Sequence, residues 1–197
     1  MHTETPSSEW IDLVRRGAIT EIVGRPSSGR TSLFRACFSA ITRAGGVAAL
    51  VDADGVFDPA GAAAAGVDLP RLLWIRGGGR RDVALRATDL LVRCPGFALI
   101  GLDLGEHPPR LSLASAFRWR VAVRRTETAL VILSARRVVE QGAALAVRTV
   151  QGGLRWTGPG REATRLSSLR SEVQVLRREG APPGATRGLP VAAWWSL

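Results

Sequence analysis

The stretch Gly24–Thr31, with the sequence GRPSSGRT, decides the fold of this chain. Its spacing is that of a phosphate-binding P-loop, in which glycines let the backbone curl around an anion while successive N–H groups point inward. The apolar segment 18–23 before it predicts a buried strand, and the apolar spacing of 32–38 after it predicts a helix. A strand, a glycine-rich turn and a helix N-terminus with its partial positive charge are the context that this motif needs.

One position of the loop departs from the P-loop pattern, because Arg30 stands where the motif has lysine. Lysine reaches the β and γ phosphates as a compact, flexible point charge, whereas arginine is a wide planar fork with a different donor geometry. Two interpretations stay open. The exchange disables hydrolysis more than binding, or it is tolerated drift in a chain whose 27 basic residues are all arginine. In either case Thr31 is expected to hold Mg²⁺ through its hydroxyl.

Composition indicates one soluble globular unit. The chain has 197 residues, 46% hydrophobic and 22% charged, and it shows neither an apolar run long enough for a bilayer nor a signal peptide. A cytoplasmic location is expected, with Cys37 and Cys94 as buried thiols. The net charge of +10 favours an acidic partner, nucleic acid first, although a solvated arginine-rich surface explains the same charge.

Strands and helices alternate along most of the chain, which predicts an α/β fold with a mostly parallel central sheet flanked by helices. Further strands are expected at 47–51, 72–75, 97–102 and 129–133, and helices at 82–93 and 111–125. Short segments at 144–150, 153–156 and 172–178 predict antiparallel strands after this core. The expected organisation is a short N-terminal helical segment (1–17), a core domain (18–179) and a Pro/Gly-rich tail (180–197).

Several motifs in the same order and spacing resemble the nucleotide-binding core of bacterial RecA recombinase. They are segments 17–33, 50–59 and 66–73, a Walker B-like segment at 99–103 and a strand at 130–133. The resemblance covers roughly residues 17–135 and implies a RecA-like P-loop core that binds ATP and Mg²⁺. The nucleotide-binding residues it implies are Gly24, Ser27, Ser28, Gly29, Arg30, Thr31, Ser32 and Asp58, with Thr31 and Asp103 as the magnesium ligands.

Departures from RecA concentrate at the same site. Asp54 matches the glutamate that activates the attacking water and is one methylene shorter, so its reach to a proton changes. Asp58 matches a residue that faces the adenine, but Gly61 replaces the aromatic that stacks on the base, and Ala135 replaces the glutamine that senses the γ phosphate. Together with Arg30, these exchanges predict a degenerate ATPase in which Asp54 is the catalytic base if any activity remains.

The DNA-binding elements of RecA are also reduced. Of its two mobile loops, the first corresponds to a short stretch near Pro108, and the second retains Arg136 and Arg137 as the DNA-binding candidates. Phosphate-driven binding needs several cations on one surface. The predicted helix 111–125 carries four further arginines, and we expect its Phe117 and Trp119 to help bury it while the arginines stay solvated.

A short RecA-like chain with a degenerate nucleotide site resembles the ImuA family, accessory proteins of SOS-induced, error-prone translesion DNA synthesis in bacteria. The resemblance implies three partners: an ImuB-like homologue of the Y-family polymerases, an error-prone C-family polymerase, and RecA itself, whose recombination such a protein would restrain. The implied function is noncatalytic and acts through protein contacts, with direct DNA contact left open. The alternative is a DNA-dependent ATPase of recombination and repair.

The tail supplies a partner-binding hypothesis. Leu189, Trp194, Trp195 and Leu197 place large apolar groups on a terminal segment, and tryptophan is enriched among interface hot spots. Either these residues dock a partner, or the tail folds back and covers the chain's own sheet.

Overall fold

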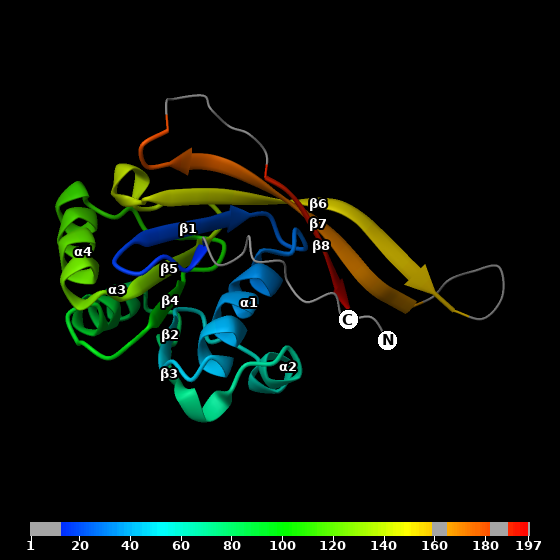
Figure 1. The fold of residues 1–197 in the computed structure, drawn as a ribbon, viewed down its shortest axis with the longest axis horizontal. Coiled ribbons are helices and arrows are strands. Elements are labelled where there is room, and N and C mark those ends of the chain that lie inside the picture. Colours follow the sequence, from blue (N-terminus) through cyan, green and yellow to red (C-terminus); the bar gives the residue numbers. More distant parts are fainter. Residues whose placement is uncertain (1–12, 159–164, 182–188, 197) are drawn as a thin grey trace.

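A computed structural model describes residues 13–158, 165–181 and 189–196. In this part of the chain an eight-stranded sheet has the order β3-β2-β4-β5-β1-β6-β7-β8 (Figure 1). The strands are β1 Ile19–Gly24, β2 Ala48–Asp52, β3 Leu72–Arg76, β4 Leu99–Asp103, β5 Ala129–Ser134, β6 Leu145–Thr157, β7 Arg165–Arg178 and β8 Leu189–Ser196. All pairings from β3 to β6 are parallel, and β7 pairs antiparallel with both β6 and β8. The predicted α/β fold with antiparallel strands after a parallel core is confirmed.

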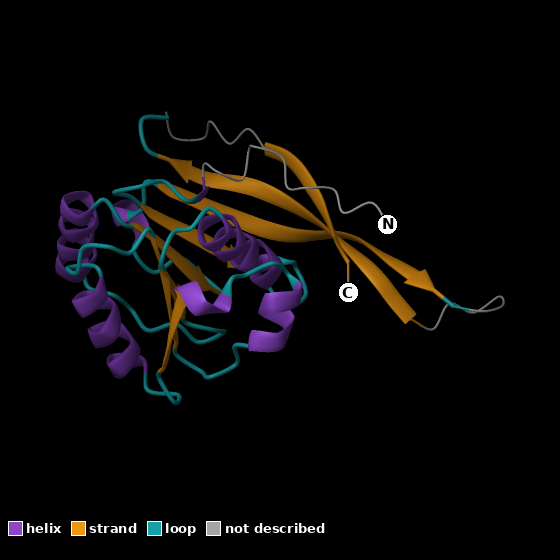
Figure 2. Cartoon of the chain, turned by 60° about the horizontal axis from the view of Figure 1, so that its bottom comes forward, coloured by secondary structure: helices purple, strands orange, loops and turns teal. Residues whose placement is uncertain are grey.

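Helices cover both faces of the parallel part (Figure 2). They are α1 Arg30–Arg43, α2 Pro59–Ala64, α3 Arg81–Leu91 and α4 Leu113–Thr126, with 3-10 turns η2 Leu69–Arg71 and η3 Glu140–Gly142. None of the helices in this described part has the length and apolar character to span a bilayer.

The core forms two layers, one on each side of the sheet, because successive side chains of a strand point to opposite faces. On β2, Ala49 and Val51 pack with residues of α3 and α4, whereas Ala48 and Leu50 pack with residues of α1 and α2. The central strands are therefore buried on both sides, which explains why they are almost continuously apolar in sequence.

The antiparallel part forms a longer ribbon than the sequence indicates. The two short strands predicted at 144–150 and 153–156 are one strand, β6, with a register irregularity between Gln151 and Gly153. Glycine tolerates such an irregularity without ending the strand. The outer halves of β6 and β7 extend beyond the helices as a twisted arm (Figure 1).

The tail contributes β8, which lies beside β7 over Ser168–Val173. The backbone of this segment thus extends the chain's own sheet. The side chains of Leu189, Trp194 and Trp195, and the whole of Leu197, lie outside the described part, so partner docking by them stays a prediction. The predicted N-terminal helical segment likewise falls mostly on residues 1–12, outside that part.

Two pairs of residues were expected to be buried, and in each pair one residue is exposed. Trp119 is buried and donates its indole N–H to Asp89 Oδ1 at 3.1 Å, but Phe117 on the same helix is 56% exposed. Cys37 is buried, whereas Cys94 is exposed because it follows the end of α3. On α4 the helical spacing was correct and the width of the buried stripe was overestimated, whereas Cys94 lies beyond the end of its helix.

Candidate functional site

The loop between β1 and α1 has the tight backbone that its glycines predict. A Cβ added to Gly24 would lie 2.4 Å from Thr149 Oγ1 and 2.5 Å from Ser28 Oγ, so only glycine fits there. Gly29, at the N-cap of α1, has φ 85°, and Ser27 has φ 60°. This left-handed backbone is the kind that turns successive N–H groups into a concave anion-binding surface.

Ser28 and Thr31 hold different places in the loop. The buried hydroxyl of Ser28 shares a 2.7 Å hydrogen bond with Thr149 Oγ1, which fixes the loop to β6. Thr31 and Ser32 lie in the first turn of α1, and the side chain of Thr31 is exposed. Thr31 is thus accessible to a ligand, while Ser28 is used to hold the loop.

Arg30 is turned back onto the protein. Its side chain is 9% exposed, Nη1 donates to the carbonyl oxygen of Gly24 at 2.6 Å, and Nη2 forms an ion pair with Glu106. Its Nε is buried without a hydrogen-bond partner in the described part of the chain. The cation that stands in the lysine position is therefore already neutralised by a carboxylate of the same molecule.

A cavity of about 290 Å³ lies beside this ion pair. Its wall includes α1 residues and the carboxyl ends of β2, β4 and β5, which is where ligands bind in open α/β sheets. Its charged lining residues are Arg30, Arg35, Asp54, Asp103 and Glu106.

Asp103 carries the most perturbed carboxyl group of the cavity. Burial raises its pKa from 3.8 to about 6, and the nearby carboxylates of Asp52 and Asp54 add to the rise, while a 2.9 Å hydrogen bond from the Gly105 N–H opposes it. A bound divalent cation would favour the ionised form of this group. Asp103 thus fits the predicted magnesium role, as does the exposed hydroxyl of Thr31.

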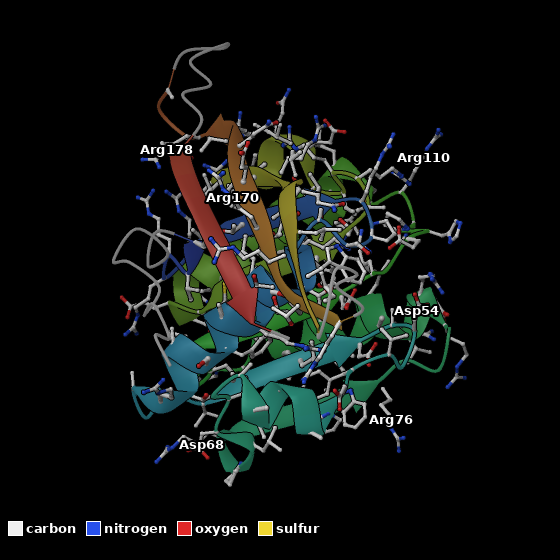
Figure 3. The ribbon with its side chains drawn as sticks, turned by 90° about the vertical axis from the view of Figure 1, so that its right-hand side faces the viewer. Asp54, Asp68, Arg76, Arg110, Arg170 and Arg178 are labelled. Atoms are coloured by element: carbon white, nitrogen blue, oxygen red, sulfur yellow. The ribbon has the colours of Figure 1, made fainter. Side chains whose placement is uncertain are left out.

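Asp54, labelled in Figure 3, lines the cavity but is held in an ion pair with Arg81 Nη2 at 2.6 Å. A Cβ on Gly105 would lie 2.1 Å from Asp54 Oδ2, so Gly105 makes room for this carboxylate. The candidate base is consequently at the site but is neutralised by a residue of α3.

Asp58 serves the backbone at the start of α2. Its carboxylate accepts hydrogen bonds from the N–H groups of Ala60 and Gly61, as an N-cap does. A Cβ at position 61 would lie 2.3 Å from Asp58 Oδ2. As long as Asp58 caps α2, a side chain at position 61 would collide with its carboxylate, so no aromatic can stack on a base from there.

The two DNA-binding candidates each donate to a partner within the chain. Arg136 Nη2 donates to the carbonyl oxygen of Pro108 at 2.7 Å. Arg137 Nε donates to Glu21 Oε2 at 3.0 Å, and Glu21, which is fully buried, also accepts from the N–H groups of Val138 and Val139. Arg137 thus fastens the loop after β5 to β1.

Sequence reasoning missed Glu21 and Asp52. Glu21 was visible as one acid inside an apolar strand, and a buried charge requires a partner. Asp52 is buried and accepts hydrogen bonds from the N–H groups of Gly55, Val56 and Phe57, which shapes the turn that carries Asp54. An aspartate just before a Gly-containing turn is a recognised signal for this arrangement.

The family model described as RecA N-terminal domain matches residues 9–105. This part of the chain is RecA-like. Protein RecA of Arthrospira platensis is 40% identical in an alignment of 110 residues that covers 52% of this chain and 30% of that protein. Protein RecA of Tropheryma whipplei (strain Twist) is 40% identical over 88 residues, which are 45% of this chain and 20% of that protein.

The matches to these relatives span less than a third of their own length. Over the whole chain the fold is similar to the crystal structure of the RadB recombinase, with a TM-score of 0.62, 15% identity, and coverage of 98% of this chain and 94% of that one. The region that the family model matches thus includes the loop, Arg30, Asp54, Asp58 and Asp103, and the similarity over nearly the whole chain is one of fold.

Proposed function

We propose that this chain is a noncatalytic RecA-like protein of DNA repair that acts through protein contacts. The observation that carries the proposal is the state of Arg30, whose guanidinium is bound to Gly24 and Glu106. A phosphate chain that entered the loop would compete with Glu106 for this guanidinium, and charge-assisted hydrogen bonds of this kind are among the stronger ones in proteins.

The hydrolytic residues support the same conclusion. Asp54 is one methylene shorter than the RecA glutamate and is paired with Arg81. A general base has to be free to accept a proton from a water within hydrogen-bond reach. The loop backbone, Thr31 and Asp103 are compatible with ATP and Mg²⁺, so nucleotide binding without turnover is the expected behaviour. Bound ATP would then stabilise and order the loop without being hydrolysed.

The finer role that we propose is that of an accessory protein in SOS-induced, error-prone translesion synthesis in the cytoplasm. Its partners would be an ImuB-like Y-family homologue, an error-prone C-family polymerase and RecA. The similarity to RecA over residues 9–105 supports contact with RecA, because a chain with a similar core would take the place of a RecA protomer without continuing catalysis. Such a chain would restrain recombination and leave the damaged template to the polymerases.

The role is tested by adding the purified full chain to RecA-driven strand exchange. We expect the yield of joint molecules to fall as the chain approaches the concentration of RecA, with the ATPase rate of RecA measured in parallel. Strand exchange that is unchanged at a molar excess of the chain contradicts the proposed restraint of recombination.

A DNA-dependent ATPase of recombination is the second candidate. The exposed Thr31 and the intact glycine backbone of the loop favour it. An ATP titration followed by calorimetry, with Thr31→Ala as the control variant, measures whether this loop binds nucleotide at all. A DNA-dependent ATPase also requires the bound ATP to be turned over.

A further inference from the structure

Helix α4 carries a second apolar stripe on its outer surface. Leu113, Phe117 and Val121 follow one another at intervals of four residues, and their side chains are 64%, 56% and 61% exposed. Trp119 and Val123 on the inner side of the same helix are buried in the core. A surface helix needs one apolar face for its own fold, so the outer stripe is available for another molecule.

A shallow groove of about 310 Å³ follows this stripe where α4 meets the end of α3. It is lined by Arg93, Phe117, Arg118, Val121, Ala122 and Arg125. The two helices lie side by side at the end of the molecule opposite the β6–β7 arm (Figures 1 and 2).

The rim of the groove is positively charged. Asp89 is the acidic residue beside it, and its carboxylate is used by Arg93 and by the indole N–H of Trp119. Arg118 and Arg125 form no ion pair with an acidic side chain in the part of the chain that the structure describes. Arg118 donates to Ser115 Oγ at 3.0 Å, and its charge also acts on Asp89, but Arg118 and Arg125 are both exposed. An apolar floor thus lies between exposed arginines.

We propose that this groove docks an acidic amphipathic segment of another protein, with apolar side chains on the floor and carboxylates against Arg118 and Arg125. Charge complementarity selects this occupant, because arginine pairs with carboxylates through two parallel hydrogen bonds. A second copy is disfavoured, since a self-complementary contact would bring the same arginines together. The floor beside Phe117 is aliphatic, so it lacks the row of aromatic platforms on which single-stranded DNA stacks.

The probe is a fluorescein-labelled synthetic peptide helix with leucines on one face and glutamates on its flanks. Its counterpart has lysine in place of every glutamate. Each peptide is titrated with the full chain and binding is followed by fluorescence anisotropy. Phe117→Ser and Arg118→Glu change the floor and the rim, and Trp156→Ser and Arg148→Glu are matched controls at exposed positions on β6.

We expect the acidic peptide to bind and the lysine peptide not to bind. Phe117→Ser and Arg118→Glu should each weaken the affinity by about tenfold or more, the size of a typical hot-spot residue, while Trp156→Ser and Arg148→Glu leave it unchanged. Equal binding of both peptides, or unchanged affinity in Phe117→Ser and Arg118→Glu, overturns the proposal. So does sedimentation that shows a dimer dissociated by Phe117→Ser, or single-stranded DNA that competes fully with the peptide.

Discussion

Replacing Asp103 with asparagine should stabilise the protein at neutral pH. Burial, together with Asp52 and Asp54, raises the pKa of Asp103 from 3.8 to about 6 in the folded chain. The folded state therefore holds this proton over a pH range in which the unfolded chain has released it, and the free energy of unfolding falls as the pH rises through that range. A pKa difference of two units corresponds to about 3 kcal/mol once both states are ionised.

Asparagine removes the charge and keeps an oxygen that can accept the hydrogen bond from Gly105. Urea unfolding at about pH 8 should show Asp103→Asn more stable by up to about 3 kcal/mol, and at about pH 4 the gain should be close to zero. Asp82→Asn is the control, because that carboxylate is exposed on α3 and a surface ion pair contributes under about 1 kcal/mol. A gain that is the same at both pH values, or a loss of stability at pH 8, refutes the reasoning.

Three further changes test other parts of the account. Glu21→Gln removes the buried carboxylate that pairs with Arg137, whose side chain is 25% exposed. Chemical denaturation should show the free energy of unfolding reduced by about 2 kcal/mol. A loss below about 0.5 kcal/mol contradicts the role of this pair. Glu106→Gln releases Arg30 from its ion pair, so a fluorescent ATP analogue should bind about tenfold more tightly. An unchanged affinity argues against the ion pair as an obstacle to nucleotide binding. Burial raises the pKa of the Cys37 thiol to about 12. A thiol reagent should therefore label Cys94 alone in the native protein and both thiols in denaturant. Labelling of both thiols in the native protein would contradict the burial of Cys37.

The sequence predicted the parallel core because that signal is local and periodic. Continuous apolar runs such as 129–133 identify strands buried on both sides, and the loop at Gly24–Thr31 fixes where the first strand ends and its helix begins. The same order of elements also placed Asp54 and Asp103 at one edge of the sheet, and both line the cavity.

The partners of Arg30 and Arg137 were beyond sequence reasoning. Arg30 pairs with Glu106, 76 positions away, and Arg137 pairs with Glu21, 116 positions away. No periodicity links such positions, because they meet only after the strands have assembled. The exposure of Phe117 was missed for a related reason, since apolar residues on two faces of one helix give the same spacing as one wide buried face.

The loss of ATP turnover is best tested by measuring phosphate release by the purified full chain, with and without single-stranded DNA. We expect phosphate release to stay at the level of the Thr31→Ala variant in both conditions, because Arg30 is held by Glu106 and Asp54 by Arg81. Release that single-stranded DNA stimulates and that Thr31→Ala abolishes would contradict the claim that this RecA-like site has lost its chemistry.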